Sequence, residues 1–83
     1  MVYWVYILRC ADGTLYTGTA ADIDKRAAVH NSGKGAKYTR SRLPVEVLYR
    51  ESCPDKGAAL RREYAIKQLS RQDKLALSAS YEG

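Results

Sequence analysis

Residues 2–19 read VYWVYILRCADGTLYTGT and decide the fold of this 83-residue chain. The β-branched and aromatic residues from Val2 to Cys10 favour a strand, and Asp12-Gly13 is a strong turn signal. Residues 15–19 return to a composition typical of strands. The chain is therefore predicted to open with a β-hairpin.

The length of the hairpin connection decides how Tyr6 and Tyr16 are arranged. A two-residue loop at Asp12-Gly13 would place them on opposite faces, whereas a three-residue or bulged loop would place both on one face. Tyrosines in strands most often pack a half-buried face. A functional role would require the phenolic oxygens to lie near a phosphate or a reacting water. A site shared by both tyrosines therefore needs an odd-length connection or a bulge.

The rest of the sequence predicts helices around one further strand. Asp22 can cap a helix that includes Ile23 and Ala27 and that Gly33 would end. Residues 32–42 form a loop or short helical turn before Pro44. A third strand is predicted from the alternation of Val45, Val47 and Tyr49 with Glu46 and Arg50.

The C-terminal part is predicted to be helical. Asp55 can cap a helix from about Lys56 to Leu69, and Ser70 with Asp73 indicates a second helix start. The order β-β-α-β-α-α predicts an α/β (α+β) fold with a small, largely antiparallel three-stranded sheet flanked by helices. The length allows one hydrophobic core, so residues 1–83 are expected to form a single domain.

Composition narrows the class of partner and the compartment. The chain has 14 Lys and Arg against nine Asp and Glu, a net charge of +5, which favours nucleic acid or an anionic membrane. The longest apolar stretch, Val2 to Leu8, is too short to span a membrane, and no signal peptide is recognised, so a cytoplasmic protein is expected. Cys10 and Cys53 match no metal-ligand spacing and fit free thiols better than a disulfide.

One carboxylate is predicted to lie on the inward side of the long helix. Glu63 shares a stripe at three- and four-residue spacing with Ala59, Leu60, Ile66 and Leu69. Such a carboxylate needs a basic residue, a metal ion or a helix terminus as its partner. The spacing alone favours an ion pair, or a position at the edge of the stripe, over a metal ligand.

Polar residues of the first helix and the segment after it form two further groups. Arg26 and His30 are one turn apart and could reach a single anion, although a lone helical histidine is more often an ordinary surface residue. The segment around Tyr38 is the most basic part of the chain, with Lys34, Lys37, Arg40 and Arg42.

The sequence resembles the GIY-YIG nuclease superfamily. Trp4-Val5-Tyr6 and Tyr16-Thr17-Gly18 occupy the places of the paired tripeptides that give that superfamily its name. The resemblance continues through Arg26 and His30 to Glu63 in residues 59–64, and so covers nearly the whole chain. Residues 32–37 and 66–69 resemble the small stand-alone bacterial members.

The resemblance implies a metal-dependent endonuclease that acts on DNA in repair or recombination. It implies that Glu63 holds one Mg²⁺ or Mn²⁺, that Arg26 contacts the phosphate and that His30 assists. Tyr16 would be the general base, with Tyr6 as its neighbour and as the alternative base. The cations implied to track the nucleic-acid backbone are Lys34, Lys37, Arg40, Arg42 and Lys67.

Other interpretations of the sequence stay open at this point. A noncatalytic nucleic-acid-binding module would keep the fold and the basic surface, and a plain interaction domain would treat the inward position of Glu63 as coincidence. No counterpart is found to the asparagine that many superfamily members carry after the glutamate. A protein partner that supplies specificity is compatible with each interpretation.

Overall fold

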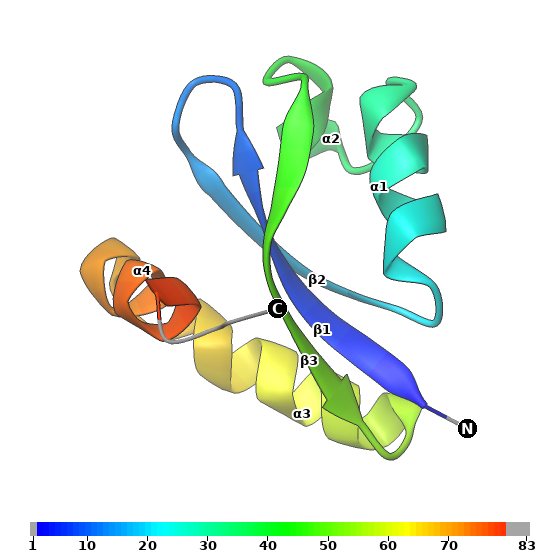
Figure 1. Cartoon of the computed structure of the whole chain (residues 1–83), viewed down its shortest axis with the longest axis vertical. Helices are drawn as coiled ribbons and strands as arrows, with labels where there is room; N and C mark the ends of the chain where they lie inside the picture. Colours follow the sequence, from blue (N-terminus) through cyan, green and yellow to red (C-terminus); the bar gives the residue numbers. More distant parts are fainter. Residues whose placement is uncertain (1, 80–83) are drawn as a thin grey trace.

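The computed structural model, which describes residues 2–79, has a three-stranded sheet with helices on both faces (Figure 1). Its elements are β1 (Tyr3–Cys10), β2 (Leu15–Ala20), α1 (Ile23–Asn31), α2 (Lys37–Arg40), β3 (Val45–Cys53), α3 (Lys56–Lys67) and α4 (Arg71–Ala79). The sheet order is β2-β1-β3, and both strand pairs are antiparallel. The predicted fold class is thereby confirmed, with the basic segment contributing the short helix α2.

The hairpin connection between β1 and β2 has an odd length. The amide of Cys10 donates to the Thr14 carbonyl at 2.9 Å, which leaves residues 11–13 as the loop. Gly13 has φ +84°, a conformation that glycine adopts without steric cost, and its amide donates to the Cys10 carbonyl. The resulting register pairs Tyr6 with Gly18 and Leu8 with Tyr16. Tyr6 and Tyr16 therefore lie on one face of the sheet, as a three-residue connection requires.

Local signals in the sequence set the helix ends. The carboxylate of Asp22 accepts from the Lys25 amide at 3.0 Å, and that of Asp55 accepts from the Ala58 amide at 2.8 Å. The hydroxyl of Ser70 accepts from the Asp73 amide at 3.1 Å. These three predicted caps are confirmed, and α3 ends two residues earlier than the predicted Leu69.

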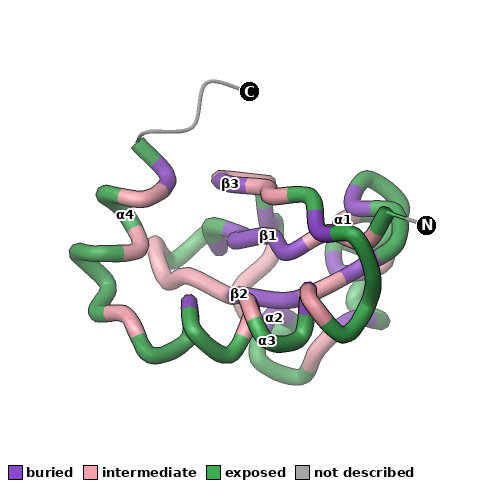
Figure 2. The backbone as a smooth tube through the Cα atoms, turned by 90° about the horizontal axis from the view of Figure 1, so that it is seen from below, coloured by how far each residue is buried: buried purple, intermediate pink, exposed green. Residues whose placement is uncertain are grey.

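The sheet separates two hydrophobic layers. One layer contains Val5 and Ile7 of β1 and packs against Ala59 and Ile66 of α3. The other layer contains the alternate residues of β1, including Tyr6 and Leu8, and packs against Ile23 of α1, Ala20 of β2 and Val45 of β3. Buried positions concentrate on the strands, while α3 and α4 are exposed along most of their length (Figure 2).

Two details of the predicted packing are wrong. Leu48 forms a bulge, because Ile7 pairs with Tyr49 while the next residue, Leu8, pairs with Val47. Val47 and Tyr49 consequently contribute to opposite layers, although their alternation predicted one face.

Leu60 is the second correction, since it is 45% exposed instead of lying in the inward stripe of α3. The narrow, three-stranded sheet buries only one side of α3, at Ala59 and Ile66. Glu63 lies at the edge of this buried side and is half-buried. A residue one position after Ala59 is rotated by about 100° around the helix and faces solvent.

The structure also bears on the state of the two cysteines and on whether a helix could cross a membrane. Cys10 and Cys53 are buried free thiols in different layers, as the sequence predicted. None of the helices within residues 2–79 has the length and apolar character needed to cross a membrane.

Candidate active site

His30 is completely buried and both of its ring nitrogens have partners. Nδ1 lies 2.9 Å from Oγ1 of Thr39, and Nε2 lies 3.2 Å from the hydroxyl of Tyr6. The Thr39 hydroxyl donates its own proton to the Ala36 carbonyl at 2.9 Å. Thr39 must therefore accept from His30, which places the imidazole proton on Nδ1.

This tautomer fixes the role of Tyr6. With its proton on Nδ1, neutral His30 offers a lone pair at Nε2, so the Tyr6 hydroxyl donates to it. Burial, and to a smaller extent the positive charge of Arg26, lower the pKa of His30. The histidine is therefore neutral at pH 7, buried, and held as an acceptor for the phenol.

Two glycines allow this close packing. A Cβ on Gly18 would lie 2.6 Å from the Tyr6 hydroxyl oxygen and 2.8 Å from Cζ, so the phenol lies directly over Gly18. A Cβ on Gly35 would collide with Nδ1 of His30 and lie 2.8 Å from its Cα. Both glycines are therefore required by close approach.

Arg26 and Glu63 act electrostatically on the same phenol. Burial is the main cause that raises the pKa of Tyr6 to about 12; the neighbouring Tyr16 adds to the increase, and the negative charge of Glu63 adds a smaller one. A hydrogen bond and the positive charge from Arg26 act in the opposite direction. Arg26 comes from α1 and Glu63 from α3, on the other face of the sheet. Since Tyr6 lies over Gly18 of the edge strand β2, its hydroxyl is within electrostatic reach of both helices.

Tyr16 joins this cluster through ring contacts. Its ring centroid lies 5.3 Å from that of His30, 6.5 Å from that of Tyr6 and 6.0 Å from that of Tyr38. Within residues 2–79 its hydroxyl has no hydrogen-bond partner, whereas the hydroxyl of Tyr6 is engaged by His30. Of the two tyrosines, Tyr16 is therefore the one whose hydroxyl is not engaged by a described residue.

Glu63 forms an ion pair with Lys67, one turn further along α3, at 3.2 Å. This is the kind of partner that the sequence pattern favoured for it. Its side chain retains 19% exposure. No group of three or more His, Cys, Asp or Glu side chains in the described part of the chain could hold a metal ion. A metal at Glu63 would therefore have at most two such side chains as ligands within residues 2–79.

The predicted nucleic-acid-binding cations are in different environments. Lys34 and Lys37 are exposed, and Nε of Arg40 donates to the Gly35 carbonyl at 3.2 Å. The guanidinium of Arg42 pairs with Asp12 at 3.1 Å, and its Cζ lies 4.2 Å from the centre of the Tyr38 ring. The ammonium group of Lys67 pairs with the carboxylate of Glu63, so Lys67 lies next to the cluster.

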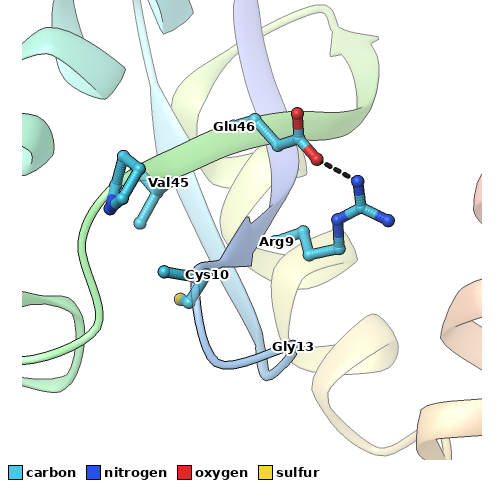
Figure 3. A pocket seen from close by; sticks show the side chains of 7 residues that line it. Arg9, Cys10, Gly13, Val45 and Glu46 are labelled. Carbon is cyan, nitrogen blue, oxygen red and sulfur yellow. Dashed lines mark hydrogen bonds and ion pairs between the residues drawn. The ribbon is translucent and has the colours of Figure 1, made fainter.

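A separate pocket of about 670 Å³ lies where the end of β1 meets the start of β3 (Figure 3). Arg9 and Glu46 form an ion pair beside it, and Cys10 and Val45 line it. It contains none of the five residues singled out by the sequence.

Sequence reasoning missed Thr39, Gly35 and Tyr38 as parts of the cluster. Thr39 lies in a cation-rich segment that was expected to be a loop or short helical turn, and its burial depends on contacts with α1. A signal was available in Gly35, because Gly33 already ends the helix and a second glycine so near indicates close backbone approach.

Comparison with known proteins shows which family the sequence matches and which proteins are similar to it. The sequence matches the family described as GIY-YIG catalytic domain over residues 2–76. A UPF0213 protein of Staphylococcus saprophyticus is 55% identical over 75 residues, which are 90% of this chain and 92% of that protein. A UPF0213 protein of Halobacterium salinarum is 54% identical over 76 residues, which are 92% and 99% of the two chains.

Solved structures are also similar. The solution NMR structure of a UPF0213 protein from Bacillus halodurans has a TM-score of 0.63 and 47% identity, covering 100% of this chain and 88% of that one. The solution NMR structure of an E. faecalis protein has a TM-score of 0.65 and 34% identity, covering 96% and 85% of the two chains.

Proposed function

The chain belongs to the family of GIY-YIG catalytic domains, and from this we propose that it is a metal-dependent endonuclease acting on DNA, in repair or recombination. The family supports a nuclease-like activity on nucleic acid. The residues proposed to carry the reaction are Tyr6, Tyr16, Arg26, His30 and Glu63.

One observation supports the proposal most directly. Side chains from two helices, α1 and α3, converge on the hydroxyl of Tyr6, with His30 in hydrogen-bond contact and Arg26 and Glu63 in electrostatic reach. Packing alone requires a buried tyrosine to have one polar partner. It does not require a neutral histidine, a guanidinium and a carboxylate around one phenol. Such a combination suits a reaction in which charge develops on a phosphate.

The hydrogen bonds favour different roles for the two tyrosines. Tyr6 remains protonated, because its pKa is raised to about 12, and its donation to His30 fixes its orientation. Tyr16 has the free hydroxyl, so we assign to its phenolate form the acceptance of a proton from the attacking water. The water oxygen then bonds to phosphorus while the bond from phosphorus to the leaving oxygen breaks. The leaving oxygen takes up a proton from solvent.

Arg26 is assigned to the phosphate. It is exposed on α1, forms no ion pair among the described residues and has a planar guanidinium that suits phosphate oxygens. Its positive charge would stabilise the negative charge that develops during the reaction.

Glu63 would hold the divalent ion, Mg²⁺ or Mn²⁺. A single carboxylate suits such a hard cation when waters and the substrate phosphate complete its coordination. When bound, the ion would neutralise charge on the phosphate and the leaving oxygen. The ion pair with Lys67 would compete only weakly with the ion, since helical pairs at this spacing contribute about 0.3–0.5 kcal/mol.

The basic segment would hold the nucleic-acid backbone near the cluster. Lys34 and Lys37 are exposed and have no ion-pair partner within residues 2–79. Such cations position a nucleic acid without selecting its sequence. Arg40 and Arg42 are assigned the same role from the same surface.

The test is cleavage by the wild-type protein and by Glu63→Gln, with single-stranded, duplex, flapped and branched DNA, and with RNA. Each reaction is run with Mg²⁺, with Mn²⁺ and with chelator. We expect metal-dependent cleavage that Glu63→Gln abolishes. Glu46→Gln serves as the matched control, because Glu46 is an exposed carboxylate paired with Arg9 outside the cluster. Equal cleavage by wild type and Glu63→Gln would exclude the proposed site.

A noncatalytic nucleic-acid-binding module is the second candidate. It is favoured by the ion pair of Glu63 with Lys67, and because residues 2–79 contain no group of three or more His, Cys, Asp or Glu side chains that could hold a metal. Salt-sensitive binding of the same nucleic acids without cleavage in either metal would establish this candidate and exclude the first.

A further inference from the structure

A pocket lined by Tyr38, whose ring contacts that of Tyr16, carries positive charge that the five-residue cluster does not use. It has a volume of about 240 Å³ and is formed where the β1-β2 hairpin, α2 and α4 meet. Its lining residues are Thr14, Leu15, Tyr38, Arg71 and Lys74. No acidic residue is among them.

The positive charges of the two cations in this pocket, Arg71 and Lys74, have no acidic partner within residues 2–79. Arg71 and Lys74 are three residues apart on α4, so their side chains share one side of the helix. Neither forms an ion pair with any residue of the described chain. Asp73 lies two residues after Arg71, a spacing that directs it to another side. Asp12, near Thr14, already accepts from the Thr14 hydroxyl at 2.6 Å and pairs with Arg42.

Tyr38 connects the pocket to the proposed catalytic cluster. Its ring is stacked on that of Tyr16, with centroids 6.0 Å apart, and the Arg42 guanidinium lies 4.2 Å from its centre. Its hydroxyl has no hydrogen-bond partner within residues 2–79. The pocket thus offers a guanidinium, an ammonium and a phenol as donors, and such a set suits a phosphate.

We propose that Arg71 and Lys74, with the Tyr38 hydroxyl, form a second phosphate subsite for the nucleic-acid strand whose cleaved phosphate lies at Tyr16. This inference rests on the proposed function. The stacked rings of Tyr16 and Tyr38, with centroids 6.0 Å apart, connect this subsite to the proposed cleavage position. The subsite would therefore hold a phosphate close to the cleaved one on the same strand.

The test compares Arg71→Ala/Lys74→Ala with wild type. Binding of a fluorescent single-stranded oligonucleotide is followed by anisotropy with chelator present, from 50 to 200 mM salt. Each phosphate contact to a single strand contributes about 0.7 to the salt slope and about fivefold in affinity at 0.1 M salt. We expect the double variant to bind about 25-fold more weakly, with a slope reduced by about 1.4. Arg71→Lys/Lys74→Arg should restore most of the binding.

The control variant is Lys56→Ala/Arg61→Ala, which removes two exposed cations of α3 that also lack ion-pair partners in residues 2–79. An equal loss of binding in both double variants would show a general charge effect and overturn the subsite. Cleavage then separates the two proposals. If wild type cuts DNA and Arg71→Ala/Lys74→Ala cuts it with unchanged KM, the subsite is wrong while the nuclease stands. If wild type neither binds nor cuts, both proposals fail.

Discussion

Thr39 fixes the proton of His30. The Thr39 Oγ1 lies 2.9 Å from His30 Nδ1, and its own proton is donated to the Ala36 carbonyl. A threonine in the four-residue helix α2 thereby determines that the histidine of α1 accepts from Tyr6. The contact joins three elements in a chain of hydrogen bonds whose directions are all determined.

Thr39→Val should destabilise the protein by about 1–3 kcal/mol, because the buried Nδ1–H of His30 loses its acceptor. Urea unfolding measures the loss. Thr39→Ser keeps the acceptor and should cost about 1 kcal/mol or less. Nitrogen NMR of the single histidine should show Nδ1 protonated and Nε2 unprotonated in wild type. The opposite tautomer would contradict the assignment.

Gly18→Ala should also destabilise the protein, by about 1–3 kcal/mol, because its Cβ would lie 2.6 Å from the Tyr6 hydroxyl. Gly57→Ala is the matched control in α3, where the nearest atoms to a Cβ are 3.4 and 3.5 Å away. There the helix should gain about 0.5–1 kcal/mol. Thermal unfolding of both variants tests the contrast. A Gly18→Ala protein as stable as wild type would show that the phenol is free to move.

Stability should fall in alkali because of Tyr6. The pKa of Tyr6 is raised from 10.0 to about 12 in the folded state, so the unfolded chain loses this proton first as the pH rises. The contribution is complete below pH 10 and is lost as the pH rises towards 12. Its size is about 2–3 kcal/mol at about 1.4 kcal/mol per pKa unit. Urea unfolding of wild type and Tyr6→Phe at pH 9 and above should show a stability difference that shrinks with pH. A constant difference would mean that burial does not hold the proton on Tyr6.

Acid should act on His30. The pKa of His30 is lowered from 6.5 by burial and by Arg26, so the unfolded chain takes up a proton before the folded protein does. The contribution of the neutral histidine is complete above pH 6.5 and is lost as the pH falls through the lowered folded value. We expect the stability of wild type to fall more steeply than that of His30→Gln as the pH falls from 7 to 5. Parallel curves would place His30 in contact with water.

Lys67→Gln should strengthen metal binding at Glu63. Removing the partner of the carboxylate should cost at most about 0.5 kcal/mol of stability and lower the half-saturating Mg²⁺ concentration about twofold. Cleavage rate as a function of Mg²⁺ measures the shift. Lys56→Gln on the same helix is the control, since its exposed side chain forms no ion pair among residues 2–79. A higher half-saturating concentration in Lys67→Gln would mean that Lys67 assists the ion or the phosphate.

The predictability of this fold follows the range of the interactions that determine each feature. The hairpin and the caps at Asp22, Asp55 and Ser70 depend on residues within about four positions, so composition and spacing reveal them. The bulge at Leu48 depends on how β3 pairs with β1, which no local pattern in β3 records.

The candidate site divides in the same way. Tyr6, Tyr16, Arg26, His30 and Glu63 were singled out from the sequence, and the structure brings them together around one phenol. Thr39 and Gly35 were missed because their contacts with His30 form only after α2 folds back on α1. The exposure of Leu60 was missed because the three-stranded sheet is too narrow to cover a wide face of α3.

Gly18 has no side chain at the place where the Tyr6 phenol lies over the edge strand. This has a consequence for how the sequence can change. The cluster draws His30 from one hydrophobic layer and Glu63 from the helix of the other, so neither layer can shift without altering the surroundings of Tyr6. A substitution that repacks either hydrophobic layer will therefore alter the surroundings of the Tyr6 phenol. If the proposed reaction takes place at this cluster, its rate and the stability of the fold are coupled, and selection for one will constrain the other.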